Sequence, residues 1–167
     1  MKTLSNIKKI PVEIAVVLAQ NETIARLLLN DTADALERSA PEHDLNFLIQ
    51  EHYISFFPPV ENRIEQYGRN TFISILLDTA LDAGDNNTRS NLVIYVSTDE
   101  EHLLLNENKN RLLEMCDKIN SLLDGKKLTT SGELRITSFS HVMLSEFHSS
   151  YRISANISDQ KKGNSDI

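Results

Sequence analysis

The sequence predicts an α+β fold, with N-terminal helices followed by a mainly antiparallel sheet of about four strands. The first observation behind this prediction is the stretch from Asn91 to Ser140, which has the pattern strand, helix, strand. The second is a clean alternation of apolar and polar residues over Tyr151–Ser158. Periods of two and of 3.6 residues distinguish strands from helices. We therefore expect one amphipathic helix, about residues 107–123, to pack on the sheet.

The segment Asn91–Ser97 is apolar at both odd and even positions. Leu92, Ile94 and Val96 would point to one side of a strand, and Val93 and Tyr95 to the other. A strand that is apolar on both faces is typical of the middle of a sheet that is covered on both sides. We expect a central strand here.

The expected helix 107–123 carries its apolar residues on one stripe. They recur at helical spacing: Leu112, Cys116, Ile119 and Leu123. Such a stripe indicates a helix lying on a sheet. Asn106 is the expected N-cap and Gly125 the expected C-terminal stop. Cys116 falls on the apolar stripe, so we interpret it as a buried core thiol and not as a nucleophile.

Composition favours one domain in 167 residues. We expect a flexible segment over 1–10, a single domain over 11–159 and a disordered tail over 160–167. The formal net charge of −7 argues against a nucleic-acid-binding surface. The single cysteine allows no intramolecular disulfide and fits a reducing compartment. The apolar run Ile14–Leu18 is too short to span a membrane, so we expect no membrane association.

The N-terminal third is predicted to be helical. Pro11 suits a first helical turn, and the apolar pattern continues to about Asn30 with a break at Asn21–Thr23. Asn30–Thr32 would either end this helix or cap a short successor over Ala33–Ser39, and Asp44 is expected to cap a further short helix.

Two adjacent prolines, Pro58 and Pro59, follow the aromatic pair Phe56 and Phe57. Prolines exclude a regular helix or a central strand at this point. The simpler interpretation is a connector held on the core by the two phenylalanines. The alternative is a docking segment for a neighbouring subunit.

A long-looped antiparallel hairpin is expected from Thr71–Asp78 and Asn91–Ser97. The linker Ala80–Ser90 holds Gly84, Asp85, Asn86 and Asn87, which are residues typical of turns.

Two closing strands are predicted after the helix. In Glu133–Ser140, Leu134, Ile136 and Ser138 would share one face, and Arg135, Thr137 and Phe139 the other. In Tyr151–Ser158 the odd residues would be buried. The intervening loop His141–His148 holds Met143, Leu144 and Phe147, and we expect it to touch something outside the monomer.

No catalytic or metal motif is apparent. None of the five histidines forms an i, i+4 pair on a predicted helix, and there is neither a nucleophile elbow nor a phosphate-cradling glycine loop. A metal site at Asp99, Glu100, Glu101 and His102 is a weak alternative, as is an enzyme that uses His141, Glu146 and His148. We expect a protein that is not an enzyme and needs no cofactor.

The order of elements resembles that of bacteriophage tail-terminator or tail-completion proteins, which belong to the neck between head and tail. The likeness covers Ile10 to Asp159. It is carried by loose local patterns: Asn21–Asn30, Leu48–Ile54, Thr71–Ile75, Asn91–Ser97, Asn110–Leu123 and the closing pair of strands.

The resemblance implies a structural virion protein that forms a ring, commonly a hexamer, on the finished tail tube. Its implied partners are identical copies, the tail tube protein and the head connector, and DNA would pass through without sequence-specific binding. Assembly would take place in the host cytoplasm. Contacts are implied at sheet edges and at these residues: Phe56, Phe57, Pro58, Pro59, Asp85, Asn86, Asn87, Met143, Leu144 and Phe147. A head-completion or neck adaptor protein and a non-viral monomeric ligand-binding regulatory module remain as alternatives.

Overall fold

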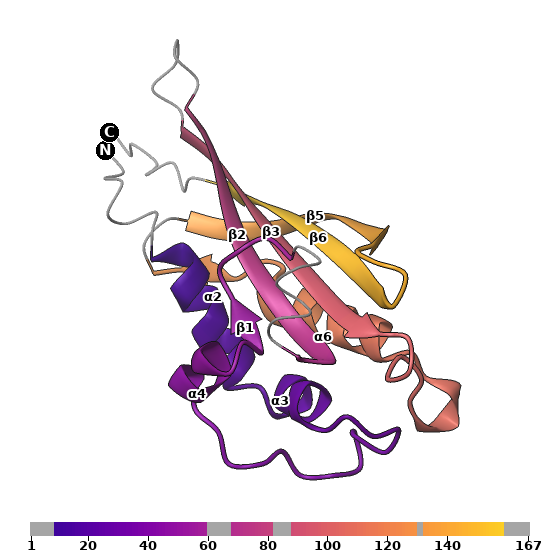
Figure 1. The fold of residues 1–167 in the computed structure, drawn as a ribbon. Coiled ribbons are helices and arrows are strands. Elements are labelled where there is room, and N and C mark those ends of the chain that lie inside the picture. Colours follow the sequence, from indigo (N-terminus) through magenta and orange to yellow (C-terminus); the bar gives the residue numbers. More distant parts are fainter. Residues whose placement is uncertain (1–8, 60–67, 82–87, 130–131, 159–167) are drawn as a thin grey trace, which may run out of the picture.

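The structure is a computed structural model that describes residues 9–59, 68–81, 88–129 and 132–158. Among these residues, the strands form one curled sheet in the order β1-β2-β3-β6-β5-β4 (Figure 1). They are β1 (Ile54–Ser55), β2 (Thr71–Leu81), β3 (Thr88–Asp99), β4 (Lys127–Leu128), β5 (Gly132–Met143) and β6 (His148–Ser158). Neighbouring strands are antiparallel except β1 and β2, which are parallel. The predicted α+β class is confirmed, and its four strands correspond to the four long ones.

The described helices have recognisable start signals. They are α2 (Ile10–Ala19), α3 (Glu22–Leu29), α4 (Leu45–Gln50) and α6 (Arg111–Leu123), with a 3₁₀ turn η1 at Asn106–Asn108. The side chain of Asn21 accepts a hydrogen bond from Ile24 N at 3.2 Å, so the predicted break separates α2 from α3. Asp44 caps α4 as expected, at 2.7 Å from Phe47 N. Ile10, which the sequence assigns to the flexible N-terminal segment, is buried in α2.

The core lies between one face of the sheet and the helices α2, α3 and α6 (Figure 1). That face carries the predicted apolar positions of all four long strands: Ile73, Ile75, Leu92, Ile94, Val96, Leu134, Ile153, Ala155 and Ile157. On the opposite face of the central strand β3, Val93 and Ser97 are also buried. The Ser97 hydroxyl donates to Ser150 Oγ at 3.0 Å. The prediction that Asn91–Ser97 is a central strand is therefore confirmed.

Several predicted boundaries were wrong. Residues 33–39 form turns and not a helix. The linker Ala80–Ser90 is shorter than expected because β2 runs to Leu81 and β3 begins at Thr88. The loop His141–His148 is shorter too, since β5 continues to Met143. Strand pairing extends both hairpins past the ends that the sequence pattern indicates.

The start of the long helix was also misplaced. Asn106 belongs to η1, and Glu107 and Asn108 adopt positive φ values of 60° and 57°, which a helix does not permit. The N-cap is Asn110, whose side chain accepts from Leu113 N at 3.2 Å. Gly125, at φ +76°, follows the C-cap, so the predicted stop is confirmed.

Replacing the true cap should cost more stability than replacing the misassigned one. Asn110→Ala removes the acceptor for Leu113 N, and we expect a loss of about 1 kcal/mol in the free energy of unfolding. Asn106→Ala removes only an exposed hydrogen bond to Glu37 and should change it by less than about 0.5 kcal/mol. Urea denaturation of both variants measures the difference, and equal losses would contradict this assignment.

Cys116 is buried on the apolar stripe of α6, as expected. Burial, with a smaller contribution from Asp117, raises the pKa of its thiol to about 12. The thiolate is the reactive form, so a disulfide reagent should react slowly with the native protein at pH 8 and rapidly in urea. Fast labelling of the native protein would show that the helix does not cover the thiol.

Candidate assembly surface

The outer edge of β5 is open over Thr137–Met143. β4 pairs only with Gly132 and Glu133. The next backbone groups are also occupied: Gly125 N donates to Leu134 O at 2.8 Å, and Ile136 N donates to Asp124 Oδ1 at 3.0 Å. Beyond Ile136, no described strand pairs with this edge.

The hydrogen bonds of the β5–β6 hairpin show in which direction the backbone N–H and C=O groups of β5 point. Leu144 N donates to His148 O at 3.1 Å, so this residue pair is hydrogen-bonded. Bonded and non-bonded pairs alternate along an antiparallel ladder. Met143, His141 and Phe139 therefore belong to non-bonded pairs with β6, and their N–H and C=O groups point away from it. In the part of the chain that the structure describes, these three residues therefore present outward backbone groups with no strand partner.

A β-bulge between Ile136 and Ser138 changes which side chains face the helices. The extra residue, Thr137, reverses the alternation, so Phe139 lies opposite the core residue Ile153. The prediction that Phe139 shares a face with Arg135, away from Leu134 and Ile136, was therefore wrong. The bulge keeps Phe139 on the helix side of the sheet.

Large apolar side chains are exposed along this margin. Phe139 is 44% exposed and Met143 62%, and Phe147 in the adjoining loop is 69% exposed. Leu113 on α6 is 45% exposed. It lies about 200° around the helix from Arg111, which packs against α3, so it faces the opposite flank. We call Phe139, Met143 and the open backbone of 137–143 the β5 margin.

The β5 margin lacks the usual protection of an edge strand. The segment from Thr137 to Met143 contains no Lys, Arg, Asp, Glu or Pro. Natural sheets commonly place charges or prolines on long edges, because an open edge templates pairing with another chain. An uncharged edge with exposed apolar residues is therefore suited to association.

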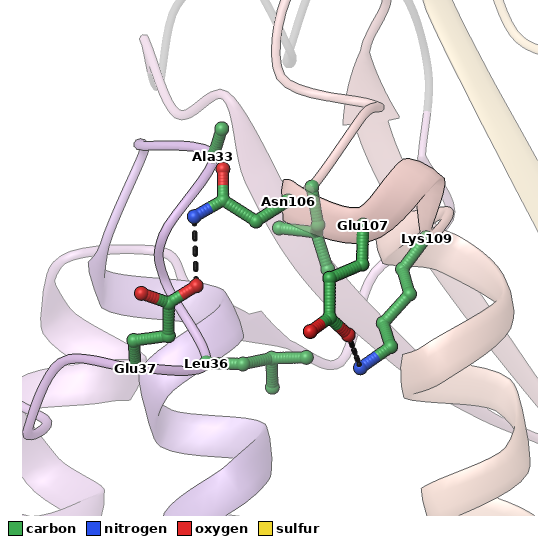
Figure 2. Close-up of a pocket in the computed structure, with 7 residues that line it drawn as sticks. Ala33, Leu36, Glu37, Asn106, Glu107 and Lys109 are labelled. Atoms are coloured by element: carbon green, nitrogen blue, oxygen red, sulfur yellow. Dashed lines mark hydrogen bonds and ion pairs between the residues drawn. The ribbon is translucent and has the colours of Figure 1, made fainter.

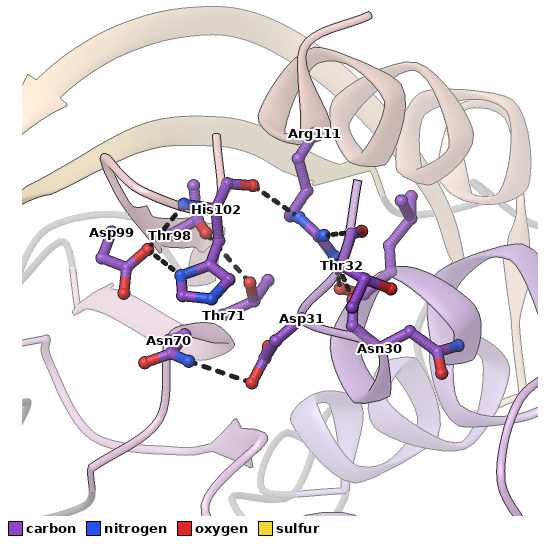
Figure 3. A network of polar contacts seen from close by, with 10 residues as sticks. Asn30, Asp31, Thr32, Asn70, Thr71, Thr98, Asp99, His102 and Arg111 are labelled. Atoms are coloured by element: carbon purple, nitrogen blue, oxygen red, sulfur yellow. Dashed lines mark hydrogen bonds and ion pairs between the residues drawn. The ribbon is translucent and has the colours of Figure 1, made fainter. Parts of the chain in front are cut away.

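A buried arginine fixes the helices behind the sheet. Arg111 is fully buried, and its guanidinium donates to four backbone carbonyls: those of Leu27, Asn30, Thr32 and His102, at 2.6, 2.8, 2.9 and 2.8 Å (Figure 3). Burial lowers the pKa of Arg111, and Asp31 and Asp99 oppose this shift. The carbonyls come from the end of α3 and from the loop after β3, so one side chain joins three segments.

A polar cluster adjoins Arg111 at the end of β3. His102 contacts Asp99 through its backbone N and its ring Nδ1, and Asn70 Nδ2 donates to Asp31 Oδ2 at 2.9 Å (Figure 3). Burial lowers the pKa of His148, the strand partner of Asp99.

In the described residues, no group of three or more His, Cys, Asp or Glu side chains is arranged to hold a metal ion.

A shallow pocket of about 230 Å³ lies between the 33–37 turn and η1. Its charged residues are already paired, since Asn106 donates to Glu37 and Lys109 forms an ion pair with Glu107 (Figure 2). The pairing lowers the pKa of Glu107 and raises that of Lys109. The pocket thus offers few unpaired polar groups to a ligand.

Comparison with known proteins identifies the family. The model of the YomW family matches residues 21–157, which is more than half of the chain. The chain belongs to the YomW family. YomW is a gene family of the Bacillus phage SPBc2, and the match indicates a phage-encoded protein. A search of curated proteins finds no match.

The region matched by the YomW family contains the β5 margin. It begins at the N-cap of α3 and ends one residue before the end of β6, so it includes the four long strands, Arg111 and α6. No helix in the described part of this YomW-family chain is both long and apolar enough to cross a membrane.

The contact residues expected from the sequence fall in three places. Asp85, Asn86 and Asn87 lie outside the described residues. Near β1, Phe56 packs against the core while Phe57 is exposed, so only the first of these phenylalanines holds the connector as expected. Pro58 is exposed and Pro59 half-buried.

The third group lies at the β5–β6 turn. Met143 ends β5, Leu144 is half-buried and Phe147 is exposed. Sequence reasoning missed Phe139 and Leu113. Phe139 was expected on the face away from the core, and Leu113 among the apolar residues of its helix. Only the bulge places Phe139 on the helix side of the sheet.

Proposed function

We propose that this YomW-family protein is a structural, non-enzymatic component of the phage virion that terminates the tail tube. Identical copies form a ring, which caps the tube and joins it to the head connector. The observation that carries this proposal is the β5 margin. A phage-encoded chain with an open, uncharged strand edge and exposed Phe139 and Met143 is suited to self-association.

Ring closure gives a physical reason for leaving this edge unprotected. A head-to-tail contact that closes on itself buries the edge of every subunit, and no free template remains. The same edge on a lone monomer would favour aggregation. The short β4, which pairs with only two residues of β5, leaves the rest of the strand available.

The acidic composition fits a channel through which DNA moves. A net charge of −7 per chain favours repulsion of phosphates over tight binding. Virion assembly in the host cytoplasm accords with a single buried cysteine, which needs no oxidising compartment.

The test uses a phage that lacks this gene and the purified full-length protein. We expect the mutant to accumulate filled heads and unjoined tails of uncontrolled length, and added protein to form rings on the tail ends in electron micrographs. Light scattering then gives the ring stoichiometry. Normal tails of fixed length that lack only a head would indicate a head-completion adaptor, and infectious particles without the gene would refute a virion role.

The pocket seen among the described residues gives little support to the alternative of a small-molecule regulator. Ligand pockets usually measure about 300–1,000 Å³ and bury most of the ligand. The pocket beside η1 is smaller, at about 230 Å³, and its charges pair with one another.

A further inference from the structure

The sheet has a second long outer strand, β2, whose edge also extends beyond its short neighbour. β1 pairs only with Ile73 and Ser74. Ile73 N donates to Tyr53 O at 2.8 Å, so the backbone groups of Ile73 point outward. By alternation, those of Ile75 and Leu77 point the same way. Among the described strands, none pairs with this edge beyond Ser74.

The strand directions make the two margins complementary. Three antiparallel steps lead from β2 through β3 and β6 to β5, so β2 and β5 run in opposite directions. Two copies placed side by side in the same orientation therefore bring β5 of one antiparallel to β2 of the other. The joined sheets then continue the antiparallel alternation of strand direction that already exists among β2, β3, β6 and β5.

We propose that the open edge of β5 pairs antiparallel with β2 of an identical copy, so that neighbouring sheets join head to tail. This inference rests on the proposed ring and specifies its subunit contact. The contact is heterologous, because one copy contributes Thr137–Met143 and the other contributes the part of β2 after Ser74. Such a contact repeats around a closed ring.

The edge of β5 and the edge of β2 both carry apolar side chains on the helix side of the sheet. Phe139 and Met143 lie on the helix side of β5 and have outward backbone groups. Ile75 and Leu77 lie on the helix side of β2 and also have outward backbone groups. Apart from His141, which lies between Phe139 and Met143, the residues named at both edges are apolar on the side that already holds the core. The bulge at Thr137 decides this match, because without it Phe139 would lie on the opposite face.

Cysteine pairs give a geometric test. Within one chain, β2 and β5 are three strand spacings apart, about 14 Å. A disulfide requires Cα atoms within about 7 Å, so a bond between these strands forms only between chains. Three double variants combine Leu77→Cys with Phe139→Cys, His141→Cys or Met143→Cys, and they cover the accessible registers. The buried Cys116 stays in place as an unreactive thiol.

We expect at least one double variant to give a ladder of covalent oligomers, up to the full ring, after oxidation of protein assembled on tail tubes. Dimers from a β5 single variant alone would mean that two β5 edges meet about a two-fold axis, which overturns the inference. Intact rings without any ladder would also overturn it while leaving the proposed function standing. The absence of rings altogether refutes the proposed function.

A backbone variant gives an independent test. His141→Pro removes one outward N–H that makes no bond to β6, whereas His141→Ala removes only the side chain, which contacts the Tyr151 ring. We expect proline to weaken ring formation at least 10-fold and alanine to change it less than 3-fold, with the monomers melting at similar temperatures. Equal assembly of the two variants, both folded, would contradict pairing through this edge.

Discussion

The Arg111→Met variant is expected to lose about 3–5 kcal/mol of unfolding free energy, because four backbone carbonyls lose their donor at once, one in a buried hydrogen bond and three in part-buried ones. Three of these carbonyls lie at the C-terminal end of α3 and just beyond it, where the helix itself supplies no partner. Methionine fills a similar volume, so the loss reports hydrogen bonding more than packing. Urea denaturation followed by circular dichroism measures the change.

A matched control separates this effect from loss of positive charge. Arg38 forms an exposed i, i+4 ion pair with Asp34, so Arg38→Met should cost less than about 1 kcal/mol. Arg111→Lys keeps the charge but not the planar fork of donors, and we expect an intermediate loss. A stability of Arg111→Met close to that of the wild type would show that water satisfies the carbonyls.

The second large effect is expected on assembly. The double variant Phe139→Lys/Met143→Lys places two charges on the β5 margin and should weaken ring formation at least 100-fold, about 2.7 kcal/mol. Burial of two apolar side chains contributes about 1.5–3 kcal/mol each, so their loss suffices. Both side chains are already exposed in the monomer, and its melting temperature should therefore change little.

The control is Val12→Lys, which changes an apolar residue on α2 that is about as exposed as Phe139. It should leave ring formation unaltered. Sedimentation velocity, with and without isolated tail tubes, compares the variants. Rings formed by the double variant at wild-type concentration would exclude the β5 margin as the subunit contact. Loss of assembly in Val12→Lys as well would mean that charge, and not location, is responsible.

The fold class was predictable because local patterns and long-range structure agree over most of the chain. The alternation in Tyr151–Ser158 and the two-sided apolar pattern in Asn91–Ser97 both correspond to the observed strands. The caps at Asn21 and Asp44 were also readable, since a capping side chain acts within four residues.

The start of α6 was less predictable. Asn106 and Asn110 are both suitable caps, and the choice depends on contacts far away in sequence. Asn106 N donates to Ala33 O, and Arg111 is held by carbonyls around α3. These contacts keep Glu107 and Asn108 in left-handed backbone conformations and delay the helix to Arg111.

The sequence by itself determined the α+β class, the core face of β2, β3 and β6, and the buried state of Cys116. Each depends on apolar periodicity, which is a local property. Only the tertiary structure decided that Phe139 lies on the helix side, that Arg111 is buried and that the β5 edge is open. The bulge, the carbonyl cluster and the unpaired edge all depend on which segments of the chain come together in space. A local sequence pattern does not contain that information.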